Sequence, residues 1–410
     1  MGPGSPVAVD LFSGAGGLAL GVASAGVDVR AHVDSWEPAV ETLRANFGEG
    51  HERLNVSDLD AVDLIELCGS KPDLLLGGPP CQSFTSAGRR DEADPRGTLV
   101  GAFSRLAVSL RPSLIVFENV EGFLTAGEGT FVHDLLEPLL DAGYCVRVRK
   151  VNLANYGVPQ HRKRVFAVAS LLGDPPFPSK THSAWGAPGA RAFHGLPRAP
   201  SVEEALAGLP EPGSNAGPLG HDLGSVSDLE VQRIAALLPG QTMRDLPDEL
   251  QHDSYRRRAF RRVMDGTPTE RRGGAPAGLR RLRGDQPSKA ITSAATRELV
   301  HPTCDRRITL REAARLQTFP DDFTFCGTLS EQSTLIGNAV PPCFAAALGA
   351  ALQAHLSGIR RSVPSPRHGA LVEFTTTSGE AMSPALSRVV ADVRDRYMSE
   401  TLFAALPTYG

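Results

Sequence analysis

Cysteine is scarce in this sequence, with six residues spread over 410 positions. None of them forms a Cys-x-x-Cys pair, and no Cys/His cluster has the spacing of zinc ligands. We therefore expect neither a disulfide framework nor a metal site. Each cysteine, including Cys81, is expected to be a free thiol.

Long hydrophobic runs are also lacking. A bilayer-spanning helix takes roughly 20 consecutive apolar residues, and no run in the sequence approaches that length. The first residues do not combine a positive charge with an apolar stretch, as a secretory signal would. With 41% hydrophobic and 21% charged residues, the composition is that of a soluble globular protein, which we expect to be cytoplasmic.

Positive charge is not in excess overall, but it is concentrated in one segment. The formal net charge is -4, yet residues 254–284 hold ten arginines against Asp265 and Glu270, a local balance of +8. The rest of the chain must then carry -12. Such segregation indicates that this segment contacts a polyanion such as nucleic acid.

Strand and helix patterns alternate over the first 170 residues. Apolar, β-branched runs at 7–12, 27–33, 53–56, 72–78, 113–120, 144–152 and 164–170 predict strands, with helical patterns between most of them. This alternation predicts an α/β fold with a parallel sheet covered on both faces, whose ligands lie at the carboxyl ends of the strands.

The composition divides the chain into four parts. After about residue 172 it becomes rich in proline and glycine, and regular helical patterns return at 308–319 and 344–356. We predict a sheet domain over 1–172, a smaller loop-rich domain over 173–286, a return to the first domain over 287–357, and an extension of unknown role over 358–410.

Glycines follow the first strand in DLFSGAGGL, residues 10–18. Glycine allows a sharp turn and a close approach of ligand to backbone, although the loop is not GxGxxG and has no phosphate-binding lysine. A simple tight turn is the alternative. Asp34 ends the next strand about 20 residues on, where an acid commonly hydrogen-bonds ribose hydroxyls. A helix-capping role for Asp34 is equally compatible with the sequence.

Further motifs follow the later strands. They are GGPPCQSF (77–84), FENV (117–120), QHRKR (160–164), REAARLQTFPDDF (311–323) and GNAVPP (337–342). Together with the first loop, these motifs resemble the cytosine-5 DNA methyltransferase family, in that family's usual order. The resemblance covers roughly residues 7–170 and 285–356.

The resemblance implies a Rossmann-like, S-adenosylmethionine-dependent sheet with helices on both faces. It makes 173–286 a target-recognition domain that binds double-stranded DNA, and S-adenosylmethionine the methyl donor, with no metal. It further implies a bacterial enzyme located at the nucleoid, either an orphan or one paired with a restriction endonuclease that acts on the same site.

The setting of Cys81 suits a nucleophile. Carbon 5 of cytosine attacks a methyl donor only after a thiolate adds at carbon 6, which makes the ring enamine-like. Cysteine is intrinsically nucleophilic, with a pKa of about 8.5. Pro79 and Pro80 precede Cys81 and fix the backbone φ of the loop. A small buried apolar residue would not need this setting.

Addition at carbon 6 moves electrons towards ring nitrogen 3, which then needs a proton or a strong hydrogen bond. Glu118 is the expected donor, because burial after the apolar strand raises the pKa of a carboxyl group. Asn119 is expected to hold the loop. The i, i+2 spacing in QHRKR places Gln160, Arg162 and Arg164 on one face of a strand; a solvated basic strand is the alternative.

By resemblance, Arg164 contacts the cytosine and steadies Glu118, and Arg162 approaches a phosphate or the nucleophile loop. The predicted catalytic residues are Cys81, Glu118, Arg162, Arg164, Asn119, Gln160 and Pro80. The predicted donor-binding residues are Phe12, Ser13, Gly14, Gly16, Gly17, Leu18, Asp34, Ser35, Asp58, Leu59, Pro79, Leu99, Asn338, Ala339 and Val340. The predicted DNA-binding residues are Ser83, Arg96, Arg256, Arg257, Arg258, Arg280, Arg281 and Arg283.

The predicted activity is methyl transfer to carbon 5 of a cytosine that has been flipped out of duplex DNA. Two alternatives remain at this point. One is methylation of cytosine in transfer RNA, against which the long arginine-rich insert argues. The other is a DNA-binding regulator without catalysis, which the intact Cys81, Glu118, Arg162 and Arg164 oppose.

Overall fold

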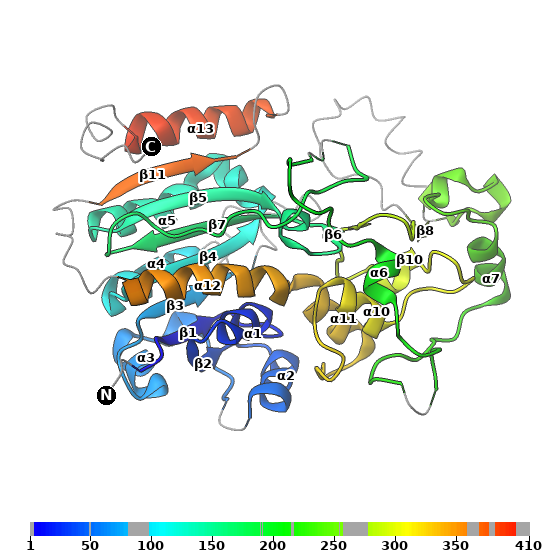
Figure 1. The fold of residues 1–410 in the computed structure, drawn as a ribbon, viewed down its shortest axis with the longest axis horizontal. Coiled ribbons are helices and arrows are strands. Elements are labelled where there is room, and N and C mark those ends of the chain that lie inside the picture. Colours follow the sequence, from blue (N-terminus) through cyan, green and yellow to red (C-terminus); the bar gives the residue numbers. More distant parts are fainter. Residues whose placement is uncertain are drawn as a thin grey trace.

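The computed structural model describes residues 4–48, 51–80, 98–188, 190, 192–214, 217–253, 255–256, 278–358, 369–376 and 382–398. Figure 1 shows a larger lobe built on a sheet, which we call the sheet lobe, and a smaller lobe of short elements beside it, the recognition lobe. The arrowheads of β4 and β11 point towards the recognition lobe. The carboxyl ends of the parallel strands therefore face the space between the lobes.

The sheet lobe contains a seven-stranded sheet in the order β11-β5-β7-β4-β3-β1-β2. Its strands are β1 (Val7–Leu11), β2 (Asp28–Val33), β3 (Leu74–Gly77), β4 (Leu114–Val120), β5 (Cys145–Asn152), β7 (Lys163–Ser170) and β11 (Ala370–Thr375). Only β7 runs antiparallel to its neighbours β4 and β5; the other pairings are parallel. The predicted α/β class is confirmed. The expected strand at 53–56 is wrong, because only an isolated bridge from Asp34 to Arg53 forms there.

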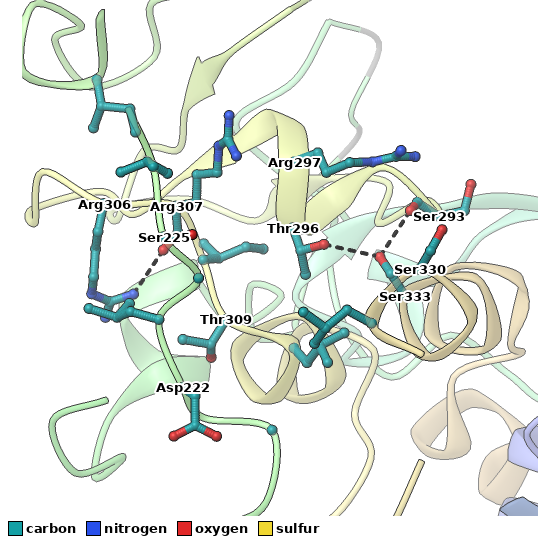
Figure 2. A pocket seen from close by; sticks show the side chains of 18 of the residues that line it. Asp222, Ser225, Ser293, Thr296, Arg297, Arg306, Arg307, Thr309, Ser330 and Ser333 are labelled. Carbon is teal, nitrogen blue, oxygen red and sulfur yellow. Dashed lines mark hydrogen bonds between the residues drawn. The ribbon is translucent and has the colours of Figure 1, made fainter. Parts of the chain in front are cut away.

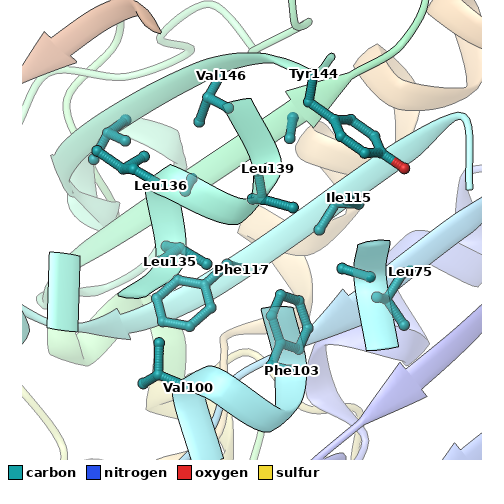
Figure 3. Packing of buried hydrophobic residues seen from close by; sticks show 14 of the residues in the cluster. Leu75, Val100, Phe103, Ile115, Phe117, Leu135, Leu136, Leu139, Tyr144 and Val146 are labelled. Atoms are coloured by element: carbon teal, nitrogen blue, oxygen red, sulfur yellow. The ribbon is translucent and has the colours of Figure 1, made fainter. Parts of the chain in front are cut away.

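Helices cover both faces of the sheet, because the strands carry apolar side chains on both sides. One face packs against α3 (Ala61–Cys68), α4 (Thr98–Leu110), α5 (Thr130–Asp141) and α13 (Pro384–Tyr397). Figure 3 shows this core, in which the rings of Phe103 and Phe117 meet edge to face with centroids 5.5 Å apart. The other face packs against α1 (Gly17–Ser24) and α12 (Pro342–Gly358).

Helix α12 begins at the end of the last sequence motif, GNAVPP, and packs on the sheet near β1. It lies along α1, where Gly21 permits the contact: a Cβ at Gly21 would lie 2.4 Å from the Cβ of Ala345. By length and composition, the helical stretch Leu329–Gly358 could cross a membrane, which the sequence had not suggested. However, 67% of its most apolar window is buried, and the stretch serves as a core element packed on α1.

The recognition lobe consists of short elements. The further helices and strands of the described residues, in both lobes, are α2 (Glu37–Phe47), β6 (Gln160–His161), α6 (Val202–Leu206), α7 (Asp228–Ala235), β8 (Arg280–Arg281), β9 (Ser288–Lys289), α9 (Ala295–Glu298), β10 (Leu299–Val300), α10 (Leu310–Leu316) and α11 (Leu329–Asn338). The same residues form 3₁₀ turns at Val56–Asp58, Glu121–Leu124, Ala126–Gly129, Leu153–Tyr156, Met243–Asp245 and Asp248–Leu250.

The C-terminal extension, whose role the sequence left open, contributes an edge strand and a helix to the sheet lobe. Strand β11 pairs in parallel with β5, and Glu373 on β11 accepts two hydrogen bonds of 2.7 Å from Arg149 on β5. Helix α13 buries one apolar face, and its Asp392 lies 2.7 Å from His133 on α5. This segment therefore extends the sheet on the side away from the first strand.

Candidate active site

A cleft of about 590 Å³ opens at the carboxyl ends of β1 to β4. Loops from these strands and the segment 334–340 enclose it. The lining residues include Asp10, Phe12, Ser13, Gly14, Ala15, Gly17, Leu18, Asp34, Ser35, Trp36, Asn55, Val56, Gly78, Pro79, Pro80, Leu99, Glu118, Asn119, Val120, Arg164, Ser293, Thr334, Leu335, Asn338, Ala339 and Val340. The position agrees with the expectation for ligands of parallel sheets.

The loop after β1 is shaped by left-handed backbone and by close packing. Phe12 and Gly14 have φ angles of 57° and 55°, so Phe12 adopts a conformation that is rare for a non-glycine residue. A Cβ at Gly17 would lie 2.3 Å from the carbonyl oxygen of Val340. Glycine at position 17 thus lets the late motif close directly over the first loop.

Asp34 connects this loop to the one after β2. Its Oδ2 accepts a 2.8 Å hydrogen bond from the Gly14 amide, and its Oδ1 accepts a 2.9 Å bond from the Trp36 amide. Burial raises the pKa of Asp34, and these amides act against that rise. Asp34 lines the cleft, and its oxygens order the two loops. It does not cap α2, because the N-cap position of that helix is Trp36 and no side chain forms a capping bond there.

Asp10, at the end of β1, is a cleft residue that the sequence did not single out. Its carboxyl group is buried, and its Oδ2 has no hydrogen-bond partner in the described part of the chain. Burial raises the pKa of Asp10 to about 7, and the neighbouring Asp34 adds to the rise. A buried polar atom that faces a cavity without a partner marks a place where a ligand group can bind. The available signal was its position at a strand end.

Glu118 and Arg164 meet at the inner wall of the cleft. Glu118 lies near the carboxyl end of β4, and Arg164 lies near the start of β7. The antiparallel pairing of these strands brings Arg164 Nε within 3.0 Å of Glu118 Oε1. The side chains are 11% and 14% exposed, so the pair is almost enclosed by protein. Burial raises the pKa of Glu118, while Arg164 and then Arg162 lower it.

The loop after β3 lies against Glu118. A Cβ at Gly78 would come within 3.1 Å of Glu118 Oε2, so a larger residue would press on the carboxyl group. Asn119 Nδ2 donates a 3.2 Å hydrogen bond to the carbonyl of Pro79. Pro79 and Pro80 line the cleft beside Glu118. The backbone is therefore tied in place up to the residue before Cys81, which itself lies outside the described residues.

Gln160 and Arg162 do not share the environment of Arg164. The short strand β6 ends at His161. Both side chains bond to Ile291, and Arg162 bonds to Gly337 as well. Neither residue lines the cleft. The chain leaves β6 before Arg162 and starts β7 after it, so the single strand face expected for QHRKR is not formed.

Most of the predicted donor residues lie together around the cleft. The predicted residues that do not line it are Gly16, Asp58 and Leu59. The ring of Phe47 occupies the space beside Gly16, where a Cβ would lie 2.6 Å from a ring carbon. The exposed Asp58 accepts a hydrogen bond from Asn55. The residues around the cleft that the sequence did not name include Asp10, Trp36, Asn55, Val56 and Ser293.

The predicted DNA-binding arginines have diverse surroundings. Ser83, Arg96, Arg257 and Arg258 lie outside the described residues. Arg283 is exposed and paired with Asp285 at 2.8 Å, and Arg256 lies 3.8 Å from Asp248. Arg281 is buried, and its guanidinium donates to the carbonyls of Ile234, His301 and Cys304 and to Asp305. These bonds turn Arg281 inward, unlike a phosphate-binding side chain.

Within the described ranges, no group of three or more His, Cys, Asp or Glu side chains could hold a metal ion.

Comparison with known proteins identifies this arrangement. The model of the C-5 cytosine-specific DNA methylase family matches residues 7–354. The chain belongs to this family. The type II methyltransferase M.HgiDI of Herpetosiphon aurantiacus is 32% identical over 85% of this chain and 94% of its own. M1.HphI of Haemophilus parahaemolyticus is 31% identical over 84% and 86%, respectively.

Solved structures agree on the fold. One described as a prophage-encoded DNA modification methyltransferase of E. coli superposes with a TM-score of 0.64 at 24% identity, covering 86% of this chain and 100% of that one. The protein is thus a DNA cytosine-5 methyltransferase with relatives in restriction-modification systems. The family and these relatives support methylation of DNA over methylation of transfer RNA, and an enzyme over a regulator without catalysis.

Proposed function

We propose that the enzyme transfers a methyl group from S-adenosylmethionine to carbon 5 of a flipped-out cytosine, within a specific DNA sequence, through a covalent bond from Cys81 to carbon 6. One observation carries the proposal: the buried Glu118–Arg164 pair and the glycine loop with Asn338, Ala339 and Val340 line a single cavity. A base held at Glu118 and a donor held by the glycine loop would therefore meet in the same space.

The sheet lobe offers suitable groups for the donor. Asp10 Oδ2, which has no hydrogen-bond partner among the described residues, would accept a hydrogen bond from an ammonium group, and the open space beside Gly14 leaves room for close approach. Trp36 and Leu99 supply apolar surface for a base. S-adenosylmethionine, when bound, supplies an electrophilic methyl group. The remaining chemistry depends on the side chains of the protein.

Glu118 would hold a proton for nitrogen 3 of the cytosine. Because burial raises its pKa, the carboxyl group is protonated more often near neutral pH than an exposed glutamic acid. Arg164, at 3.0 Å, fixes the orientation of the carboxyl group and stabilises the charge left when the proton moves. Asn119 keeps the Pro79–Pro80 turn in place, which would present Cys81 towards carbon 6.

We propose that residues 1–172 and 287–357 form the catalytic domain and that 173–286 recognises the target. Arg256, Arg257, Arg258, Arg280 and Arg283, with Ser83 and Arg96 of the nucleophile loop, would neutralise phosphates or contact guanine edges. In this proposal the enzyme acts on double-stranded DNA in the bacterial cytoplasm at the nucleoid, with or without a restriction endonuclease of the same specificity.

A trapping experiment tests the covalent step. Plasmid DNA is first methylated by the enzyme, and bisulfite sequencing identifies the target site. A duplex with 5-fluorocytosine at that site is then incubated with enzyme and S-adenosylmethionine. After methylation, fluorine blocks removal of the group at carbon 5, so the adduct should survive denaturing electrophoresis.

Peptide mapping of the trapped complex should place the adduct on Cys81, with Cys68, Cys145, Cys304, Cys326 and Cys343 unmodified. Cys81→Ala should give no complex. An adduct on another cysteine, or methylation that proceeds without any adduct, would refute the mechanism.

A further inference from the structure

Arg162 is a fully buried arginine whose hydrogen bonds reach two separate segments of the chain. Its Nη1 donates to the carbonyl of Ile291 at 2.8 Å, and its Nη2 donates to the carbonyls of Gly337 and Ala339 at 2.8 and 2.9 Å. Ile291 begins the segment 291–293, which leads from the recognition lobe into the cleft wall. Gly337 and Ala339 flank Asn338 in the segment 337–340, which lines the donor side of the cleft.

Two glutamines complete this arrangement. Gln160 Oε1 accepts a 2.9 Å bond from the Ile291 amide, so both backbone groups of Ile291 are bound by side chains of QHRKR. Gln160 Nε2 donates to Gln317 Oε1 at 2.8 Å, and Gln317 in turn donates to the carbonyl of Ile336. Through these hydrogen bonds, Gln160, Arg162 and Gln317 hold the backbone of residues 291, 336, 337 and 339 together.

The two segments also touch directly. A Cβ at Gly337 would lie 2.2 Å from the Ser293 amide nitrogen, so the backbones are in contact. Ser333 Oγ on α11 donates a 2.9 Å hydrogen bond to the Ser293 carbonyl, as Figure 2 shows. Ser293 lines both the donor cleft and a neighbouring pocket of about 510 Å³ bounded by Arg297 and α11. A displacement of residues 291–293 would therefore also displace the segment 337–340, which lines the donor side of the cleft.

We propose that Arg162 is a positioning residue that holds the donor segment 337–340 against the recognition-lobe segment 291–293, so that donor binding and DNA binding depend on one guanidinium. This inference rests on the proposed function and goes beyond it. It assigns to Arg162 a role in positioning the backbone, through the carbonyls of Ile291, Gly337 and Ala339. Arg164, two residues on, remains the side chain that faces the cytosine site.

The test uses the full-length chain and the variant Arg162→Lys. Lysine retains the charge, but it cannot reach three carbonyls in two directions as the planar fork does. We expect the dissociation constant of S-adenosylhomocysteine, measured by calorimetry, to rise roughly five- to tenfold, as for loss of buried hydrogen bonds. The KM for the donor should rise similarly, with kcat changed less than about twofold.

Coupling is measured by repeating the calorimetry with saturating unmethylated plasmid DNA. Any ratio between the two dissociation constants in the wild type reports the coupling between sites, and Arg162→Lys should move that ratio towards one. Arg311→Lys is the matched control. Arg311 is equally buried and donates to the carbonyls of Leu219, Pro320 and Phe323, away from the donor segment. The variant Arg311→Lys should lower the thermal stability of the protein without changing its affinity for the donor.

The outcomes separate the alternatives. If Arg162→Lys binds the donor as the wild type does, or weakens DNA binding alone with a flatter salt dependence, the inference is overturned. If Arg162→Lys does not fold, Gln317→Glu decides, because it turns acceptor oxygens towards the carbonyls of Ile336 and Ala339 and should weaken donor binding in the same way. Failure of the wild type to bind S-adenosylhomocysteine would refute the proposed function itself.

Discussion

The two lobes of this protein use buried charge differently. In the sheet lobe, Asp10 and Glu118 are buried at strand ends beside a cavity, and burial raises the pKa of both. In the recognition lobe, Arg281 is just as buried, but both of its Nη atoms donate to the protein, to three carbonyls and to Asp305. Buried carboxyl groups beside a cavity mark where a ligand binds, whereas an arginine that donates to several carbonyls marks where short elements are held together.

The difference follows from the architecture of each lobe. A sheet with helices on both faces satisfies its own backbone through ladder and helix hydrogen bonds, so polar side chains at its edge remain available for chemistry. The strands β8 and β10 of the recognition lobe are only two residues long. Carbonyls around such short elements need other donors, and arginine supplies several at once. An arginine in this lobe is therefore not evidence of DNA contact by itself.

The largest effect is expected in the sheet lobe, from Cys81→Ser. A hydroxyl group is far less acidic than a thiol, so addition at carbon 6 should fail and methyl transfer should fall by at least about a thousandfold. Donor affinity should stay within about twofold. Transfer of tritium from labelled S-adenosylmethionine to duplex DNA measures the rate, and turnover near that of the wild type would contradict the proposed role.

The next effect concerns Glu118→Gln, which keeps the shape of the side chain but removes its transferable proton. We expect a fall of about 10²–10⁴-fold in kcat, the usual contribution of general acid catalysis. Glu121→Gln is the matched control, because Glu121 lies on the following turn, is half exposed and pairs with Lys150. Single-turnover rates should separate the two variants, and equal rates would argue against proton donation by Glu118.

The same contrast explains which features could be predicted from the sequence. The residues that meet at the cleft could be predicted from the strand-end motifs, because a regular sheet brings the ends of its strands together whatever the loop sequences are. Phe12, Glu118 and Arg164 meet in this way. The roles of Arg162 and Arg281 could not be predicted, because they depend on carbonyls at least 20 residues away in chain segments without a regular pattern. Asp10 was overlooked because its motif was read for its glycines.

The edge strand β11 shows another limit of the sequence. Its partner β5 is more than 200 residues away, and the pairing depends on Glu373 meeting Arg149 across the strands. A short apolar run in a C-terminal extension does not reveal such a partner. Helix α13 buries Leu386, Val389, Val390 and Val393 on one face, which covers the sheet.

A third prediction concerns stability and pH in the sheet lobe. Burial raises the pKa of Asp10 from 3.8 to about 7. Both states hold the proton below pH 4, but between about pH 4 and 7 the unfolded chain releases it while the folded protein keeps it. The stability of the apoprotein should therefore fall as pH rises through this range, by roughly 4 kcal/mol at most.

Asp10→Asn cannot ionise and should lack this fall. Urea unfolding of both proteins at several pH values measures the difference, and S-adenosylhomocysteine should reduce it if a ligand ammonium pairs with Asp10. A wild type whose stability relative to Asp10→Asn is the same at pH 4 and pH 8 would show that Asp10 titrates normally.

A fourth prediction moves to the recognition lobe, where Arg281→Lys should act on stability. Lysine keeps a charge near Asp305 but loses bonds to the carbonyls of Ile234, His301 and Cys304, so the free energy of unfolding should drop by about 2–3 kcal/mol. The dependence of DNA affinity on salt should not change, as measured by fluorescence anisotropy with labelled duplex. A flatter salt dependence would mean that Arg281 contacts phosphate after all.

The smallest effect is expected at the surface, where the lobes offer a matched pair of arginines. Arg283 in the recognition lobe lies 2.8 Å from Asp285, and Arg30 in the sheet lobe lies 2.7 Å from Asp28; both side chains are exposed. Each ion pair is local, and Arg30 Nη1 also donates to the Cys68 carbonyl and the Ser70 hydroxyl at 3.3 and 3.2 Å. These contacts are at the surface, so replacing either arginine with glutamine should leave the fold intact. If Arg283 neutralises a phosphate, Arg283→Gln should reduce the slope of log affinity against log salt by about 0.9, whereas Arg30→Gln should not alter it. Equal slopes for both variants would remove Arg283 from the DNA-binding surface and leave the segment 254–277 as the basic part of that surface.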